Sequence, residues 1–162
     1  MFHQNDTSEI LIRKAVPADL EALLRFEQGI AEAERPMDST LKEGEIHYYD
    51  LAQLIAAENV HLVVAELNGE LLGGGYADIR DAKDYLKHRR YAHLGFMYVK
   101  PEHRGKGINH LVLESLKAWC RGRGIFELRL EVYDSNIPAI RAYEKAGFTK
   151  NLVEMRIDLN AG

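Results

Sequence analysis

The segment from Tyr91 to Ala118 constrains the fold most. It contains a strand-like apolar run, a short break at a proline and then apolar residues at helical spacing. An apolar run at residues 94–99 is rich in the aromatic and β-branched types that favour strands. Pro101 cannot donate to a sheet ladder and therefore ends that strand. Apolar residues then recur at helical spacing, at Ile108, Leu111, Val112, Leu116 and Trp119. The segment predicts a buried strand that leads through a turn into a long helix.

The turn, residues 104–109, is basic and contains two glycines. The free N–H groups of a helix N-terminus and the helix dipole favour an anion there. Gly105 and Gly107 allow a ligand to approach the backbone closely, while Arg104 and Lys106 add positive charge. A tight connection with solvated cations and no ligand fits these residues equally well.

Two familiar nucleotide motifs do not fit this turn. A P-loop requires Ser or Thr after its Gly-Lys pair, whereas Gly107 follows Lys106 here. A dinucleotide fingerprint requires a third glycine at the position of His110. The turn is therefore neither a P-loop nor a dinucleotide-binding loop.

The turn resembles the acyl-CoA loop of the GNAT N-acetyltransferase superfamily, whose pattern is Arg/Gln-x-x-Gly-x-Gly/Ala. Arg104 and Gly107 match it, and Asn109 stands where a small residue is usual. A downstream segment resembles the family's Asn-x-x-Ala-x-x-x-Tyr-x-x-x-Gly-Phe pattern, matched by Asn136, Ala139, Tyr143, Gly147 and Phe148. The matching part of the chain is residues 91–148, and earlier residues match only in the order of elements. Asn136 is also an ordinary helix N-cap candidate, and Gly147 an ordinary C-cap.

The resemblance implies acetyl-CoA as co-substrate, with its pantetheine arm on the central strand, its pyrophosphate on the turn and Tyr143 near the thioester sulfur. An amide-rich arm can pair with the free edge of a strand, in the manner of an added strand. The implied cofactor-binding residues are Met97, Tyr98, Val99, Arg104, Gly105, Lys106, Gly107, Ile108, Asn109, Asn136, Ala139 and Tyr143.

Tyr143 is the candidate general acid for the leaving thiolate. Its reference pKa of about 10, against about 8.5 for a thiol, favours a hydrogen bond over early proton transfer. His93, on the central strand, and Glu131, on the following strand, are two candidate bases, and a structural role or a water molecule remains open for each. The seven histidines lack ligand clusters and the His-Glu-x-x-His spacing, so we expect no metal.

The order of elements predicts an α/β chain with a mixed, mostly antiparallel twisted sheet and helices on both faces, as in the GNAT fold. Asn68-Gly69 predicts a two-residue hairpin turn between strands at 61–67 and 70–80. Gly73 to Gly75 predict a bulge, or a close approach by ligand or backbone. Residues 32–48 predict an irregular loop, and residues 148–159 predict a closing strand or a bent pair of strands.

With 162 residues, 46% of them hydrophobic, the chain is expected to be one domain, 1–162, whose 1–90 half binds the acceptor and whose 91–162 half binds acetyl-CoA. No segment has the length of a membrane span or the pattern of a signal peptide. The single cysteine, Cys120, excludes an internal disulfide and favours a cytoplasmic location. A net charge of −4 argues against nucleic acid as a partner.

Three functions fit the sequence. The first is acetyl-CoA-dependent N-acetylation of a primary amine of a small molecule, peptide or protein by direct attack in a ternary complex. The second is a non-catalytic acyl-CoA sensor or regulatory module, and the third is binding of another phosphate compound. The acceptor is not identified, although acids at 32–45 and bases at 80–90 suggest a zwitterion. A homodimer is left open.

Overall fold

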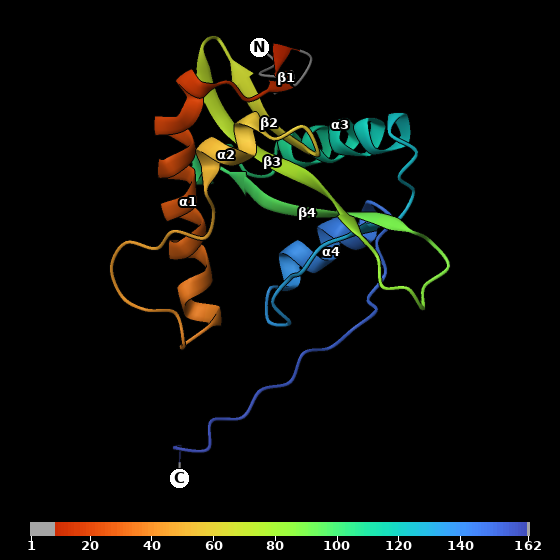
Figure 1. The fold of residues 1–162 in the computed structure, drawn as a ribbon. Coiled ribbons are helices and arrows are strands. Elements are labelled where there is room, and N and C mark those ends of the chain that lie inside the picture. Colours follow the sequence, from red (N-terminus) through yellow and green to blue (C-terminus); the bar gives the residue numbers. More distant parts are fainter. Residues whose placement is uncertain (1–8, 162) are drawn as a thin grey trace.

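The structure is a computed structural model that describes residues 9–161, and it contains one five-stranded sheet with helices on both faces (Figure 1). The strands lie in chain order, β1 to β5, and only the β4–β5 pair is parallel. Their bounds are β1 Leu11–Lys14, β2 Val60–Leu67, β3 Glu70–Asp81, β4 Arg90–Val99 and β5 Leu128–Arg129. The α-helices are α1 Leu20–Glu34, α2 Leu51–Ala56, α3 Ile108–Gly122 and α4 Ile137–Lys145, with 3-10 turns at Pro17–Asp19, Arg35–Met37 and Pro101–His103. The expected mixed, mostly antiparallel sheet is confirmed.

Two apolar cores lie on the two faces of the sheet. One core contains α3 residues such as Leu116, with Ala92 and Leu94 of β4, and α4 packs against it through Tyr143. The other contains residues of α1 and α2 with Phe96. Cys120 is fully buried in the first core, and burial raises its pKa to about 11, as expected for a structural thiol.

The β2–β3 hairpin forms at the predicted turn. Asn68 and Gly69 both adopt left-handed backbone, with φ of 49° and 82°. The glycine run in β3 allows close contact between strands, since a Cβ at Gly74 would lie 2.5 Å from the carbonyl oxygen of Val63. The structure therefore assigns a packing role to that glycine.

Strand β4 carries a bulge in its pairing with β3. Gly74 pairs with Tyr98 and Tyr76 pairs with Gly95, so two β4 residues face one residue of β3. Phe96, inside this bulge, has φ of 56°, an uncommon conformation for an aromatic residue. The bulge sends the Phe96 side chain to the face opposite Leu94.

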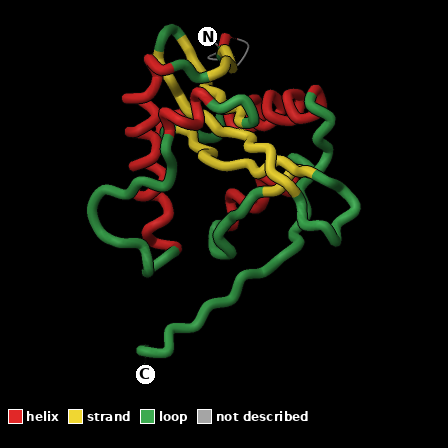
Figure 2. The backbone as a smooth tube through the Cα atoms, in the orientation of Figure 1, coloured by secondary structure: helices red, strands yellow, loops and turns green. Residues whose placement is uncertain are grey.

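The C-terminal prediction is wrong. Residues 148–159 form no strand, and the tail runs away from the body of the molecule as an extended loop (Figure 2). Its apolar side chains are exposed; Leu152 and Met155, for example, are 91% and 89% exposed. The alternation of apolar and polar residues from Leu128 to Tyr133 also predicts a strand, and only Leu128–Arg129 of it forms one. A pattern of alternating residues becomes a strand only when a neighbouring edge is within reach, and within residues 9–161 none is paired with the tail.

Candidate acetyl-transfer site

Strands β4 and β5, at one edge of the sheet, pair over a short stretch only. They pair only at Ala92 with Leu128 and at His93 with Arg129. From Leu94 to Val99, the β5-facing edge of β4 has no strand partner within the described chain. The predicted pantetheine-binding residues Met97, Tyr98 and Val99 lie on this open edge. An extended, amide-containing ligand can satisfy such backbone groups by adding as a strand.

The basic turn lies at the end of this open edge and begins α3. Gly107 is the N-cap of α3, with φ of 81°, and no side chain caps the helix. Gly105 also has positive φ, and a Cβ on either glycine would meet nothing within 4 Å. The first N–H groups of α3 therefore face open space, which suits a phosphate. Arg104 folds back, donating from Nε to the Val99 carbonyl oxygen at 3.1 Å.

The side chains of the turn beyond Arg104 are partly exposed. Lys106 Nζ lies 3.3 Å from His103 Nδ1, and Asn109 is half-buried at the second position of the helix. Ile108 is buried in the α3 core, so only its backbone can contact a ligand. The six predicted residues of the turn therefore offer mainly backbone N–H groups as hydrogen-bond donors to a ligand.

Tyr143 lies on α4, and Asn136 begins that helix. The Asn136 side chain accepts a hydrogen bond from the Ala139 backbone at 3.3 Å, which confirms the predicted N-cap. The Tyr143 ring packs edge-on against Phe148 at 5.9 Å and against the α3 core. Its hydroxyl bonds to no residue in 9–161, yet the atom is not sealed from solvent. Burial raises the pKa of Tyr143 to about 12, which favours hydrogen-bond donation over ionisation.

His93 and Glu131 lie close enough to interact electrostatically, and His93 faces the side of the sheet opposite Tyr143. His93 is the last β4 residue paired with β5, and its ring lies 6.3 Å from Tyr76 in the core under α1 and α2. Burial, with the positive charge of Arg80, lowers the pKa of His93, while the nearby Glu131 carboxylate opposes that shift. A neutral imidazole can accept a proton. Tyr143 and His93 therefore come from opposite faces of the sheet.

A buried carboxylate organises the loop that covers the α1 face. Glu27 is fully buried; it accepts hydrogen bonds from the Tyr48 and Tyr49 backbone N–H groups at 3.0 and 3.1 Å and lies 2.9 Å from His47 Nδ1. Sequence reasoning assigned Glu27 no function. The signal available in the sequence was an acidic residue at a position of α1 where the helical spacing otherwise places apolar, core-facing side chains. Glu27 holds residues 47–49 against α1.

Acidic and phenolic groups gather near the end of α1. Tyr48 donates to Glu34 at 3.0 Å, and Tyr133 donates to Asp38 at 2.9 Å. Hydrogen bonds from Thr40 hold the pKa of Asp38 below its usual range, whereas burial raises the pKa of Glu34. We refer to Glu34, Asp38, Tyr48 and Tyr133 as the acidic cluster. The two tyrosines were not predicted, since their positions depend on contacts up to 95 residues apart.

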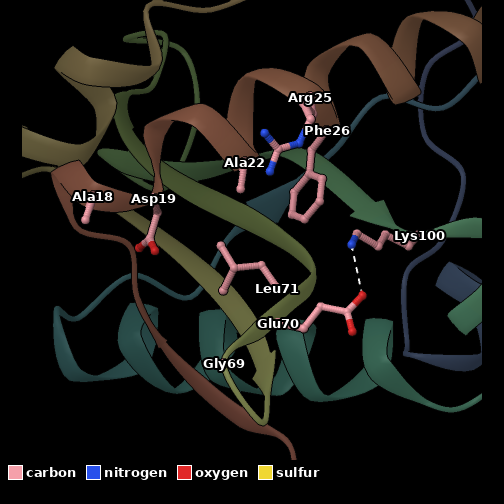
Figure 3. A pocket seen from close by; sticks show the side chains of 9 residues that line it. All are labelled: Ala18, Asp19, Ala22, Arg25, Phe26, Gly69, Glu70, Leu71 and Lys100. Carbon is pink, nitrogen blue, oxygen red and sulfur yellow. Dashed lines mark hydrogen bonds and ion pairs between the residues drawn. The ribbon is translucent and has the colours of Figure 1, made fainter.

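A separate hollow of about 430 Å³ lies at the other end of α1 (Figure 3). Phe26 and Arg25 of α1 line it, together with Leu71 and the Lys100–Glu70 ion pair, whose atoms are 3.1 Å apart. Glu70 also belongs, with Glu102 and His103, to a group of possible metal ligands. The Lys100 ammonium occupies the Glu70 carboxylate, so this group is a poor cation site. Neither feature includes a predicted catalytic residue.

Three observations, all within residues 9–161, fit acetyl-CoA: an unpaired edge of β4, a helix N-terminus without a side-chain cap and a Tyr143 hydroxyl that bonds to no described residue. None of the helices among residues 9–161 has the length and apolar character needed to cross a bilayer.

Solved structures share this architecture. A predicted acetyltransferase from Clostridium acetobutylicum, crystallised with acetyl-CoA, superposes with a TM-score of 0.71 at 20% identity, covering 94% of this chain and 98% of that one. An aminoglycoside 6'-N-acetyltransferase from Acinetobacter haemolyticus gives a TM-score of 0.69 at 18% identity, over 92% and 99% of the two chains. These similarities establish the fold class, that of the GNAT acetyltransferases.

The sequence comparisons agree. The chain matches the Acetyltransferase (GNAT) family over residues 23–148, and it belongs to that family. An aminoglycoside N(6')-acetyltransferase type 1 from Stenotrophomonas maltophilia is 28% identical over 91% of this chain and 93% of its own length. A streptothricin acetyltransferase from Escherichia coli is 36% identical over 40% of this chain and 37% of its own length. The protein is an acetyl-CoA-dependent N-acetyltransferase.

Proposed function

We propose that this enzyme acetylates a primary amine of a small, positively charged acceptor, with amino sugars of the aminoglycoside type as the first compounds to test. The acidic cluster is the observation that carries the proposal. Its carboxylates lie beside the loop that Glu27 organises; Asp38 is paired with Arg156 at 3.1 Å, so a cationic amine would be attracted to Glu34 and would compete with Arg156 for Asp38. The relative from Stenotrophomonas, which matches over 91% of the chain, supports the same acceptor class.

The earlier zwitterion hypothesis is less well supported. The acidic loop before α2 and the basic loop between β3 and β4 lie at opposite sides of the molecule in Figure 1. Arg80, at the end of β3, is engaged with Asp78 at 3.0 Å. The proposal therefore uses the acidic side alone.

In this proposal the chain acts as one domain, with residues 1–90 receiving the amine and 91–162 holding acetyl-CoA, which supplies the activated acetyl group. Met97, Tyr98 and Val99 orient the arm, and the N–H groups of residues 104–109 hold the pyrophosphate. Binding both substrates together makes the attack effectively intramolecular. No metal is part of the mechanism.

The groups that accept the amine proton and that stabilise the departing thiolate lie on opposite faces of the sheet in this proposal. His93 accepts the proton of the attacking amine, directly or through water, with Glu131 as the alternative acceptor. Tyr143 donates a hydrogen bond to the departing sulfur. A pKa of about 12 against about 8.5 for a thiol makes complete proton transfer unfavourable by about 5 kcal/mol, so the hydrogen bond is the useful contribution.

A panel of amines with acetyl-CoA, read by release of free thiol, tests the acceptor. We expect aminoglycosides and other polyamines to react, and neutral amino compounds of similar size to react poorly. Asp38→Asn should raise KM for a cationic acceptor by roughly tenfold, the effect of losing one charged contact, with KM for acetyl-CoA unchanged. Glu43→Gln makes the same charge change at an exposed position of the same loop and should have little effect. Equal activity towards neutral and cationic acceptors would contradict the acceptor class.

A further inference from the structure

Tyr76, on β3, combines a buried ring with an unpaired hydroxyl. The residue is 4% exposed and packs in the core under α1 and α2. Its hydroxyl bonds to no residue among those described, yet every fully buried polar side-chain atom among them has a partner. The exposed part of Tyr76 therefore includes its hydroxyl. Polar groups at the edge of a core are normally paired, so this hydroxyl is available to a ligand.

The Tyr76 hydroxyl lies over the backbone of β4. Tyr76 pairs with Gly95 in the sheet. A Cβ at Gly95 would lie 2.5 Å from both Cζ and Oη of Tyr76, so the end of the ring occupies the space that a larger residue would fill. Gly95 is two residues beyond His93, the last β4 residue paired with β5. The missing side chain at Gly95 therefore places the hydroxyl at the start of the open β4 edge.

This position coincides with the expected place of the thioester, and here the inference rests on the proposed function. With the pyrophosphate on residues 104–109 and the arm on residues 97–99, the arm runs back along β4 away from the turn. The next residues along that edge are Phe96 and Gly95. An acetyl group at the end of the arm would therefore lie beside the Tyr76 hydroxyl, on the face where His93 also lies.

We propose that the Tyr76 hydroxyl holds the attacking amine of the acceptor by accepting a hydrogen bond from one of its N–H groups. The other N–H group faces His93, and the two contacts together direct the nitrogen lone pair to the acetyl carbon. The carbon–nitrogen bond forms, the carbon–sulfur bond breaks, and CoA leaves as a thiolate that Tyr143 stabilises. One amine proton passes to His93 and the other stays on the amide nitrogen. Tyr76 keeps its own proton throughout.

The charged groups around Tyr76 suit this role. Asp78 and Arg80, on the same strand, pair with each other at 3.0 Å. His93 and Glu131 are then the nearby groups able to take a proton. Burial raises the pKa of Tyr76, so its hydroxyl stays protonated while its oxygen accepts the hydrogen bond.

The acceptor loop also supports the Tyr76 ring. The ring of Tyr49 meets it edge-on, with centroids 5.7 Å apart. The backbone N–H of Tyr49 is held in turn by Glu27 at 3.1 Å. The segment that receives the amine is thus packed directly against the residue that positions it.

Tyr76→Phe tests the proposal, because it keeps the ring over Gly95 and removes only the hydroxyl. Kanamycin, a polycationic amino sugar, and glycinamide, a small amine, serve as separate acceptors with saturating acetyl-CoA. We expect kcat/KM for the amine to fall roughly tenfold to a hundredfold, as for a polar group left without its partner. The Kd of acetyl-CoA and the melting temperature should not change. Tyr85→Phe, at an exposed tyrosine, is the control. An unchanged kcat/KM for Tyr76→Phe would overturn the proposal.

Gly95→Ala moves the hydroxyl without removing it. The added Cβ displaces the end of the Tyr76 ring, so we expect a comparable loss of kcat/KM. In the Tyr76→Phe background the same change should cost less than about twofold more, since the hydroxyl is already absent. Losses that multiply fully would overturn the proposal. Tyr76→Phe decides alone if Gly95→Ala does not fold.

The two amines separate this inference from the proposed acceptor class. If Tyr76→Phe slows both reactions but the unchanged protein shows no preference for kanamycin, Tyr76 is supported and the cationic acceptor is contradicted. If kanamycin is preferred and Tyr76→Phe acetylates it at the full rate, the acceptor class is supported and the role of Tyr76 is overturned. No thiol release by the unchanged protein with any amine would contradict both.

Discussion

The cofactor side of the site presents backbone groups, whereas the proposed acceptor side presents side chains. On the cofactor side, the open edge of β4 and the start of α3 present backbone groups, and the glycines at 105 and 107 keep that backbone accessible. On the proposed acceptor side, the groups are side chains such as Glu34, Asp38 and Tyr133, from segments far apart in the chain. Backbone groups tolerate many sequences around them, whereas a side-chain cluster depends on each member.

This difference accounts for the division between shared and variable chemistry. Every acetyl-CoA presents the same pantetheine and pyrophosphate, so one backbone arrangement serves the whole family. Acceptors differ in charge and shape, and a loop held by one buried carboxylate can be changed without altering the sheet. Four substitutions test whether the two sides are as independent as this description requires.

Tyr143→Phe should have the largest effect, because Tyr143 is the one side chain on the cofactor side with an assigned chemical role. The ring and its packing against Phe148 remain, and only the hydroxyl is lost. We expect kcat to fall by roughly 10²–10⁴, the usual range for a general acid. Acetyl-CoA affinity should change little, since the bond to sulfur strengthens in the transition state. Single-turnover rates should accompany kcat, because slow product release can mask the loss. Equal single-turnover rates would remove Tyr143 from the mechanism.

Glu27→Ala should be the largest change on the acceptor side. It leaves the Tyr48 and Tyr49 N–H groups without their acceptor, and each such loss costs about 1–3 kcal/mol when buried. We expect the free energy of unfolding in urea to fall by about 2–4 kcal/mol. At a temperature where the variant stays folded, KM for the amine should rise and the Kd of acetyl-CoA should not. Glu21→Ala, on the exposed side of the same helix, is the control. A parallel loss of acetyl-CoA affinity would show that the two sides are coupled.

Gly107→Val should weaken acetyl-CoA binding by at least roughly a hundredfold, the equivalent of one or two hydrogen bonds to a charged group. The added side chain would occupy the space in front of the first α3 N–H groups. Valine is also strained at φ of 81°, so a matched control is needed. Gly124, after the other end of α3, has φ of 72° and equally open surroundings, and Gly124→Val should carry the strain without the binding loss. Titration calorimetry of both variants measures the difference.

Asn109→Ala should have the smallest effect on acetyl-CoA binding. It tests whether a side chain of the turn contributes to that binding. The Asn109 amide is half-buried, one residue after the buried Ile108. A hydrogen bond from that amide to a phosphate is worth about 1.5–3 kcal/mol, which predicts a rise in acetyl-CoA Kd of about tenfold to a hundredfold. Arg104→Ala is the companion, because Arg104 bonds to the Val99 carbonyl oxygen. An unchanged Kd for Asn109→Ala would mean that the larger residue is only tolerated.

The features predicted from sequence are those whose causes lie within a few residues. The hairpin at Asn68-Gly69, the N-cap at Asn136 and the glycine that begins α3 depend on local backbone conformation. The closing strand failed for the opposite reason. Its alternation was read correctly as strand-like, but a strand requires a partner edge, and that requirement is not local.

The amino-acid sequence by itself determined the β2–β3 hairpin, the N-cap of α4, the turn that presents free N–H groups and the family that the chain resembles, because these depend on torsional preferences and on short spacings. Only the tertiary structure decided that β4 and β5 diverge after His93, that the Phe96 bulge redirects β4, and that Asp38 meets Tyr133 across 95 residues. These depend on how two cores pack on opposite faces of one sheet. Each of these features depends on residues that are far apart in the sequence, so no short window of sequence contains both of the segments involved.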